Sequence, residues 1–487
     1  MKDKKLNTNL YIKILFILSS MLFAMPSIIY FLQKGTVLNF GPYFQFLYEM
    51  PISRLTQSII YIVILGLITI SYFLIIKKRK EIFKNTKKMF IFIAIIAIIF
   101  IAVLPFTSSD IFYYLGVGRL ESKYHQNPYY TTIKEFVEKD NNKSFLENDT
   151  VLKQGYINDW SASTVVYGPV WTLICRLIGF LSFGNVDIGL FVFKIINVLI
   201  HLLNCYLIYK ISNRKLFTLL YGLNPLVLIE GIACVHNDIF VVLFILLSLF
   251  FVRKKKNLVV STIFLAMATA IKYFAIILLP FIIIYHYKNE KPLKRFLKCL
   301  QYGVIFVVAL IIPYLFYVQN IRVLSGVITQ QGKLAKSFYI IITEYFKYPA
   351  ISVNTVNHIL LACFTIIYFF TCIILLNKKQ IKFKQEMRKA SYFIMAFLFL
   401  LITNFQPWYI LWIFPFIIWQ KKEEIIWIPQ MAIMCEFANS VFLTYGEGWQ
   451  NGVPFTFIFI VGSLMLWIIN EKRNNSRIRK KSNILIS

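Results

Sequence analysis

The stretch FTSSDIFYYLGVGRLESKYHQNPYY, residues 106–130, follows an apolar run and opens the longest polar interval in the sequence. The run before it, residues 89–106, has close to the ~20 apolar residues that a membrane-spanning helix needs. Asp110 is the first carboxylate after that run. The pattern therefore predicts that Asp110 lies at the edge of a lipid bilayer, where a membrane-spanning helix ends and water begins.

The composition of the chain indicates a membrane protein with many helices. Of its 487 residues, 58% are hydrophobic and only 15% are charged, which is too few to cover the surface of a soluble protein of this length. The formal net charge is +30, but the Lys and Arg residues occur in short clusters between apolar runs. Such clusters are typical of cytoplasmic loops under the positive-inside rule, so we expect a lipid bilayer as partner and no nucleic acid.

All seven cysteines lie within apolar runs, so no extracytoplasmic disulfide framework is expected. The N-terminal residues MKDKK and the apolar run that continues to about Phe31 resemble a signal peptide. However, the run is long enough to span a bilayer, and no small-residue cleavage site follows it. We interpret it as a retained first span.

The alternation of apolar runs and basic clusters predicts an all-α polytopic membrane protein, with about fourteen transmembrane helices and both termini cytoplasmic. We expect one integral domain over residues 1–487. The run 258–287 is too long for one crossing and is basic on both sides, so we predict two short helices with Lys272 near the outer turn between them. The expected spans are 11–32, 59–76, 89–106, 188–209, 216–235, 239–252, the two halves of 258–287, 299–317, 358–376, 392–405, 409–419, 425–444 and 455–469.

Two long polar intervals are expected on the outer side. Residues 107–164 form an outer loop that is too long to be featureless, and a capping-box pattern at 132–135 predicts a short helix that runs toward Phe145. Residues 167–183 predict a helix that lies in the outer membrane interface. Residues 319–357 form a second outer loop. Its basic residues, which either select an acidic acceptor or are simply solvated, are Arg322, Lys333 and Lys336.

Polar residues surround Asp110 in the sequence. Hydroxyl groups precede it at residues 107–109, and the side chains of Tyr113 and Tyr114 could line a groove. A carboxylate just past a helix end is also often only solvated or a helix cap. The cations that follow within a few helical turns are Arg119, Lys123 and His125.

Further polar residues are predicted at the same depth of the membrane. Each is equally compatible with a loop tip or a turn, and only their convergence on the outer face favours a binding site. They are His236, Asn237 and Asp238 at the end of one outward span, Asn404, Gln406 and Trp408 near the end of another, and Tyr167, Gly168 and Pro169 at the start of the interfacial helix.

Ionisable residues also occur inside apolar runs, where they are functional hypotheses by default. Lys194, Asn197, His201 and Asn204 have the spacing of one helix face, and the alternative to function is hydrogen bonding between helices. The same alternatives apply to Glu230. Lys194 either extends to the interface or binds an anion. The position of Lys272 between two short apolar helices requires an anion or water nearby.

The chain contains no metal-ligand spacing, no P-loop and no Gly-rich dinucleotide turn. We therefore expect no metal and no cofactor.

Six short motifs, in this order, resemble the GT-C superfamily of integral-membrane glycosyltransferases, specifically the polyprenyl-phosphate-mannose-dependent transferases of bacterial envelopes. They cover roughly residues 90–420. They are SSDIFYY (108–114), NPYY (127–130), YGPVW (167–171), NPLVLIEGIACVHND (224–238), AIKYFAIILLP (270–280) and QPWYILWIFP (406–415).

The resemblance implies an acidic residue in an early outer loop that acts on the acceptor, and Asp110 is the matching position. Some relatives have two acidic residues there, whereas this chain has Ser108 and Ser109 before a single Asp, which disfavours a metal. The resemblance further implies a multi-pass cell-membrane protein that binds a polyprenyl-phosphate sugar, with an extracytoplasmic active site. The acceptor it implies is an envelope glycan or glycolipid.

The chemistry of these residues fits transfer of a hexose such as mannose. We expect Asp110 to be the general base and the transfer to invert the anomeric centre in one displacement. Cations can stabilise the departing phosphate without a metal, and the expected ones are Lys272, Arg119 and Lys194. The residues expected to bind sugar or acceptor are His236, Asn237, Asp238, Tyr113, Tyr114, Tyr167, Gln406 and Trp408. A flippase or transporter of a lipid-linked glycan, and an envelope polysaccharide polymerase or ligase, are the alternatives.

Overall fold

The computed structural model describes residues 2–40, 53–139, 142–320, 323, 326, 353–421 and 424–440. Within these ranges the regular elements are helices and no strand is present, which confirms the predicted all-α class. The buried apolar side chains form one continuous core, in which helices from both halves of the chain take part.

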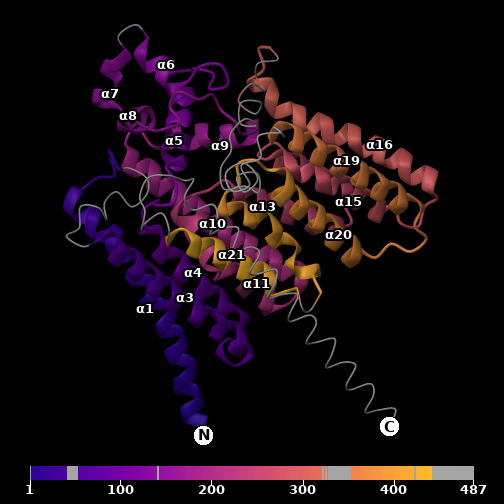
Figure 1. Cartoon of the computed structure of the whole chain (residues 1–487), viewed down its shortest axis with the longest axis horizontal. Coiled ribbons are helices and arrows are strands. Elements are labelled where there is room, and N and C mark those ends of the chain that lie inside the picture. Colours follow the sequence, from indigo (N-terminus) through magenta and orange to yellow (C-terminus); the bar gives the residue numbers. More distant parts are fainter. Residues whose placement is uncertain are drawn as a thin grey trace.

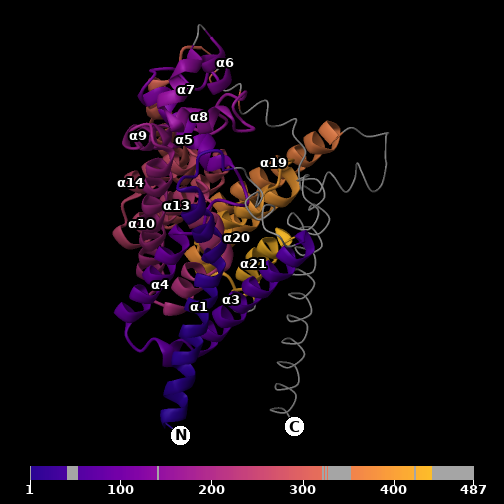
Figure 2. The same cartoon turned by 90° about the vertical axis from the view of Figure 1, so that its left-hand side faces the viewer.

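Three helices form the N-terminal part of the bundle: α1 (Lys2–Lys34), α3 (Arg54–Ile82) and α4 (Thr86–Ile101). Side-chain caps start the second and third of them, because Ser53 Oγ accepts from the amide of Thr56 at 3.2 Å and Asn85 Oδ1 accepts from the amide of Lys87 at 2.7 Å. α1 starts at the end of the molecule opposite the small helices α6–α8 and runs toward them (Figures 1 and 2).

The predicted outer loop 107–164 contains five short helical elements at that opposite end of the molecule (Figure 1). The capping box is confirmed, since Thr132 and Glu135 satisfy each other's backbone amides at 3.0 and 2.9 Å. The helix that it starts ends at Glu138, so the predicted extension toward Phe145 is wrong, and a new helix begins at Phe145 itself. The elements are α5 (Asp110–Ser122), α6 (Ile133–Glu138), η1 (Asn142–Ser144), α7 (Phe145–Asn148) and α8 (Thr150–Tyr156).

The predicted interfacial helix is α9 (Pro169–Leu181), which crosses α5 at very short distance. The crossing is possible because both helices have a glycine there: a Cβ atom on Gly118 would collide with the backbone carbonyl of Cys175, and one on Gly179 with the backbone of Gly118. Beside the crossing, Glu121 pairs with Arg176 at 3.2 Å and accepts from the Tyr317 hydroxyl at 3.1 Å. Burial raises the pKa of the Glu121 carboxyl, and these two partners partly offset that effect.

The middle of the chain forms the centre of the bundle. Asn185 starts its long helix by accepting from two backbone amides, and Pro225 starts a new helix after a bend of 57°. η2 is a single turn of π-helix. The elements are α10 (Val186–Ser212), α11 (Lys215–Gly222), α12 (Pro225–Leu228), η2 (Ile229–Ala233), α13 (Asp238–Phe250) and η3 (Phe251–Lys255).

The predicted break near Lys272 is confirmed. The run divides into α14 (Leu258–Thr269), then η4 (Tyr273–Leu278) and α15 (Leu279–His286). Lys272 lies between α14 and η4 and has an extended backbone conformation. Backbone bonds join this break to the start of α9, because the amides of Gly168 and Val170 donate to Ile271 and Ala270 at 3.3 and 3.2 Å. Residues about 100 positions apart in the sequence are therefore adjacent.

The remaining helices flank this centre, and α16 and α19 lie at its side (Figure 1). They are α16 (Pro292–Ile311), η5 (Ile312–Phe316), α19 (Val353–Asn377), α20 (Phe383–Ala396), η8 (Phe397–Leu401), η9 (Pro407–Trp419) and α21 (Trp427–Ala438). Most of the predicted loop 319–357, with Arg322, Lys333 and Lys336, and the predicted span 455–469 lie outside the described residues.

Five described helices are long and apolar enough to cross a membrane, or six if the bent pair is one span. Four more apolar helices are shorter, so the predicted number of about fourteen is not confirmed. The protein is nonetheless a membrane protein by its apolar helices. The long ones are Thr8–Lys34, Arg54–Ile82, Val186–Ser212, Pro292–Phe316 and Asn354–Asn377.

We expect Gly118→Ala to destabilise the protein by about 1–3 kcal/mol, because the added methyl group forces α5 away from α9. Thermal unfolding of the purified protein in detergent measures this. Gly303→Ala in α16 is the matched control, since nothing lies within 4 Å of its Cβ position and the change should be neutral or slightly stabilising. Equal unfolding temperatures for the two variants would contradict the close crossing.

Candidate active site

A cavity of about 430 Å³ lies where α5, the α14–η4 break, α19 and the η8–η9 segment meet. Both polar and apolar side chains line it, and the apolar ones include Leu361, Phe397 and Leu401. Seven of the side chains singled out in the sequence line it: Asp110, Tyr113, Tyr167, Lys272, Asn404, Gln406 and Trp408. The structure therefore brings together residues from four separate motifs.

Asp110 is the first residue of α5, where the helix dipole favours a negative charge. Its side chain is 13% exposed and faces the cavity. The Tyr114 hydroxyl, one turn further along α5, donates to Oδ2 of Asp110 at 3.2 Å and lies 3.0 Å from the Tyr167 hydroxyl. The amide of Asp110 donates to Ser108 Oγ at 3.1 Å, so the preceding serine orients the helix start. One carboxylate oxygen is thus held by the Tyr114 hydroxyl while the group remains accessible.

Lys272 is paired with a carboxylate and surrounded by aromatic rings. Its Nζ lies 2.7 Å from Oδ1 of Asp238, which is fully buried. The Trp412 indole N–H donates to the same oxygen. The ammonium also lies 4.3 Å from the ring centroid of Tyr409 and 5.9 Å from that of Tyr167. Lys272 therefore presents a fixed positive charge to the cavity.

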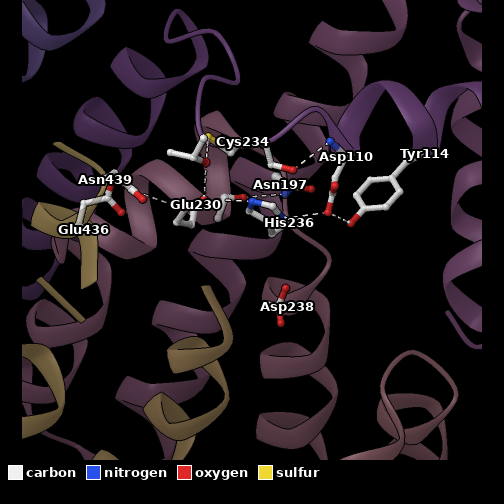
Figure 3. A network of polar contacts seen from close by, with 12 residues as sticks. Asp110, Tyr114, Asn197, Glu230, Cys234, His236, Asp238, Glu436 and Asn439 are labelled. Atoms are coloured by element: carbon white, nitrogen blue, oxygen red, sulfur yellow. Dashed lines mark hydrogen bonds and ion pairs between the residues drawn. The ribbon is translucent and has the colours of Figure 1, made fainter. Parts of the chain in front are cut away.

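His236 lies between two carboxylates. Its Nε2 is 3.0 Å from Oε2 of Glu230, and its Nδ1 is 3.9 Å from Oδ2 of Asp110 (Figure 3). The imidazole stacks on Trp408, with ring centroids 3.6 Å apart and planes at 13°. Asn237 is fully buried beside it, and its side chain has no hydrogen-bond partner among the residues that the structure describes.

Arg119 and Lys194, predicted beside the donor phosphate, do not line this cavity. The Arg119 Nε lies 2.5 Å from Oδ2 of Asp149, a carboxylate that also accepts from Tyr124 at 3.0 Å. Lys194 is fully buried and donates to two backbone carbonyls, those of Ile101, at 3.1 Å, and Val103. Both cations have structural partners where they lie.

The predicted polar stripe on α10 faces inward, as its spacing indicated, and its amides and imidazole bond to neighbouring helices. Asn197 donates to the carbonyl of Gly231 at 2.7 Å, and His201 lies 3.1 Å from that of Gly222. Asn204 donates to Tyr221 and Ile239, each at 3.0 Å. Hydrogen bonding between helices, one of the two interpretations considered, therefore describes these residues.

Some residues of the site were not singled out from the sequence. Tyr409 and Trp412 lie on one face of η9, and the QPWYILW motif held the signal for them. Glu436 and Asn439 lie at the end of α21, behind Glu230, and the signal was a carboxylate inside an apolar run. Among the described residues, no three His, Cys, Asp or Glu side chains are grouped as metal ligands would be.

A carboxylate and a lysine face one cavity in a bundle of membrane-length apolar helices, which defines a membrane protein with charged groups in a cavity. The family model of the alpha-(1->6)-mannopyranosyltransferase N-terminal domain matches residues 17–288, more than half of the chain, and the chain belongs to this family. It is a mannosyltransferase. No curated protein and no solved structure matches it. The matched range includes Asp110, His236 and Lys272 but ends before η9.

We expect Lys272→Met to destabilise the protein by about 3 kcal/mol, because it leaves the Asp238 carboxylate buried without its cation. The double variant Lys272→Met/Asp238→Asn should recover most of this loss, since neither charge then remains. Thermal unfolding of four proteins, the parent, Lys272→Met, Asp238→Asn and the double variant, measures both effects. If the double variant were as unstable as the sum of the single ones, the two side chains would not form a coupled pair.

Proposed function

We propose that this mannosyltransferase takes mannose from a polyprenyl-phosphate-linked donor and transfers it, with inversion, to a hydroxyl of an envelope glycan or glycolipid. The observation that carries the proposal is that Asp110 and Lys272, the expected base and the expected phosphate ligand, line the same cavity. The GT-C resemblance of the motifs supports it.

Asp110 is suited to act as the general base. Its carboxylate reaches the cavity, and a base must lie within hydrogen-bond reach of the acceptor hydroxyl. In the transfer, the acceptor oxygen attacks the anomeric carbon as its proton moves to Asp110. The bond from the anomeric carbon to the phosphate oxygen breaks, and its electron pair stays on the phosphate. A single displacement of this kind inverts the anomeric centre.

Lys272 is suited to hold the departing phosphate. A fixed cation stabilises the negative charge that develops on the leaving oxygen, because it needs no reorganisation during the reaction. Asp238 and Trp412 fix the ammonium, and the neighbouring tyrosine ring limits its movement. The same cavity is also lined by Leu361, Phe397 and Leu401, whose apolar side chains suit the first isoprene units of the lipid.

Trp408, Gln406 and Tyr167 line the cavity near these two groups and are suited to bind the sugar ring and its hydroxyls.

We further propose a multi-pass topology with both termini cytoplasmic and the cavity on the extracytoplasmic side. Its support is the distribution of basic clusters, such as residues 77–80 at the end of α3.

We expect Asp110→Asn to lower the rate of mannose transfer by 10²-fold or more, because the amide cannot accept the proton. The measurement is transfer of radiolabelled mannose from polyprenyl-phosphate mannose to candidate acceptors by the purified protein. Asp159→Asn is the control, since Asp159 is exposed in the same outer segment. Transfer by Asp110→Asn at the parent rate would exclude the base assignment, and lipid movement across vesicles without any transfer by the parent would favour a flippase.

We expect the neutral pair Lys272→Met/Asp238→Asn to raise the KM for the lipid-phosphate donor by about 10- to 100-fold, the loss of one charge-assisted contact. The matched control is Arg119→Met/Asp149→Asn, which removes an ion pair of the same kind outside the cavity. Steady-state kinetics against donor concentration separates the two. If the two double variants had equal KM values for the donor, the assignment of Lys272 as a phosphate ligand would be wrong.

A further inference from the structure

Glu230, His236 and Asp110 form a line from the interior of the protein to the cavity (Figure 3). The first two side chains are fully buried, and only Asp110 reaches the cavity. Each ring nitrogen of His236 has one carboxylate oxygen near it, at 3.0 Å for Glu230 and 3.9 Å for Asp110, and these are charge contacts without hydrogen-bond geometry. The longer contact leaves room for closure when substrate binds.

The imidazole is held in this orientation by several independent contacts. One face stacks on Trp408, and the His236 amide donates to the carbonyl of Glu230 at 3.0 Å. The preceding residue, Val235, has a φ of 60°. A β-branched residue in the left-handed region is strained, and such strain persists only where the surrounding structure imposes it. The backbone thus has an unfavourable conformation that sets the position of the ring.

Glu230 is in turn fixed from the side opposite the cavity. The Thr107 hydroxyl donates to Oε2 at 2.8 Å, and the Asn439 amide to Oε1 at 3.4 Å. Asn439 also donates to Glu436, which accepts from Tyr61 at 2.9 Å. A buried carboxylate needs such donors. Oε2, the oxygen nearest the imidazole, is therefore held in place.

We propose that Glu230 is a positioning residue of the transfer reaction: it orients the His236 imidazole with Nδ1 toward Asp110, so that the ring takes over the proton that Asp110 removes from the acceptor. This inference rests on the proposed function of Asp110. It assigns a role to a residue that touches neither the cavity nor the substrate.

The proton balance of this step is complete. Asp110 gains the acceptor proton during the displacement and becomes neutral. Nδ1 of His236 then accepts that proton, which restores the Asp110 carboxylate, and the resulting imidazolium lies between Glu230 and Asp110, both negative. The proton passes to water when the products leave. The lipid phosphate departs with the electron pair of the broken bond.

The charges around His236 favour this transfer. From α5 it faces Asp110, with Tyr114 behind that carboxylate, and from η2 it faces Glu230. Asp238, two residues further along the chain, is paired with Lys272. The other titratable side chains near Glu230 are Cys234 of the same turn, Glu436 of α21 and Tyr61 of α3. The two carboxylates that flank the ring, Asp110 and Glu230, both stabilise a positive charge on it.

The first test compares Glu230→Gln, His236→Asn and the double variant with the parent in the transfer assay. We expect each single variant to lower kcat by about 10- to 100-fold with KM changed less than threefold. The double variant should be no slower than the slower single variant, because residues that act as one unit are not additive. The proposal would be overturned if the kcat losses of the two single variants multiplied in the double variant. It would also be overturned if His236→Asn kept the parent kcat, and this outcome can be measured even if Glu230→Gln does not fold.

The second readout is the pH dependence of kcat, which a purely structural role would not move. In Glu230→Gln the acidic limb of the pH profile of kcat should shift to lower pH, because the His236 imidazole holds a proton less firmly without the negative charge of Glu230. Glu386→Gln is the matched control: Glu386 is fully buried in α20 and paired with Lys378 and Lys389. It should leave the limb unchanged. An unshifted limb in Glu230→Gln contradicts the proposal.

A third measurement does not depend on transfer. The chain has five histidines, and ¹⁵N-histidine NMR of the protein in detergent, assigned with His236→Asn, follows the protonation of this ring against pH. We expect the protonation of the His236 ring to move to lower pH in Glu230→Gln, because the substitution removes a neighbouring negative charge. An unchanged midpoint overturns the positioning role. If instead the parent transfers no mannose, or Asp110→Asn transfers it normally, the proposed function fails and this comparison still stands.

Discussion

The ion pair between Lys272 and Asp238 is the interaction on which the arrangement of the site depends. It joins the break between α14 and η4 to the first residue of α13, and the indole of Trp412 attaches η9 to the same oxygen. Neither charge could be buried alone in an apolar bundle without a large cost in free energy. The pair therefore joins three segments of the chain, and two of them, the α14–η4 break and η9, line the cavity together with α5, α19 and η8.

Much of this could be predicted from the sequence. Helical periodicity predicted that the polar stripe of α10 faces inward, and the basic flanks of residues 258–287 predicted the break at Lys272. The partners of the other two cations could not be predicted in this way. Asp149 and Arg119 lie in separate segments of the chain. The groups that hold Lys194 are backbone carbonyls, and because nearly every residue has one, the sequence does not indicate which of them bind this lysine. Periodicity describes which face of a helix is buried, but the identity of its neighbour depends on the packing of the whole chain.

The number of spans was difficult to predict for a related reason. A hydrophobic run gives the length of an apolar segment, whereas bends and breaks depend on backbone groups finding other partners. Pro225 and the π-helical turn η2 divide one apolar run, and the break at Lys272 divides another. These interruptions coincide with Glu230, His236 and Lys272. The regular helices thus form the support, and the site is built where helices stop.

The left-handed conformation of Val235 has a consequence for the evolution of this chain. Residues held in such a conformation cost about 1–3 kcal/mol, and a glycine at position 235 would relieve that strain. It would also give the backbone beside the imidazole more freedom. A search for more stable versions of the protein would therefore favour a glycine at this position, which is the change that frees the backbone next to the imidazole.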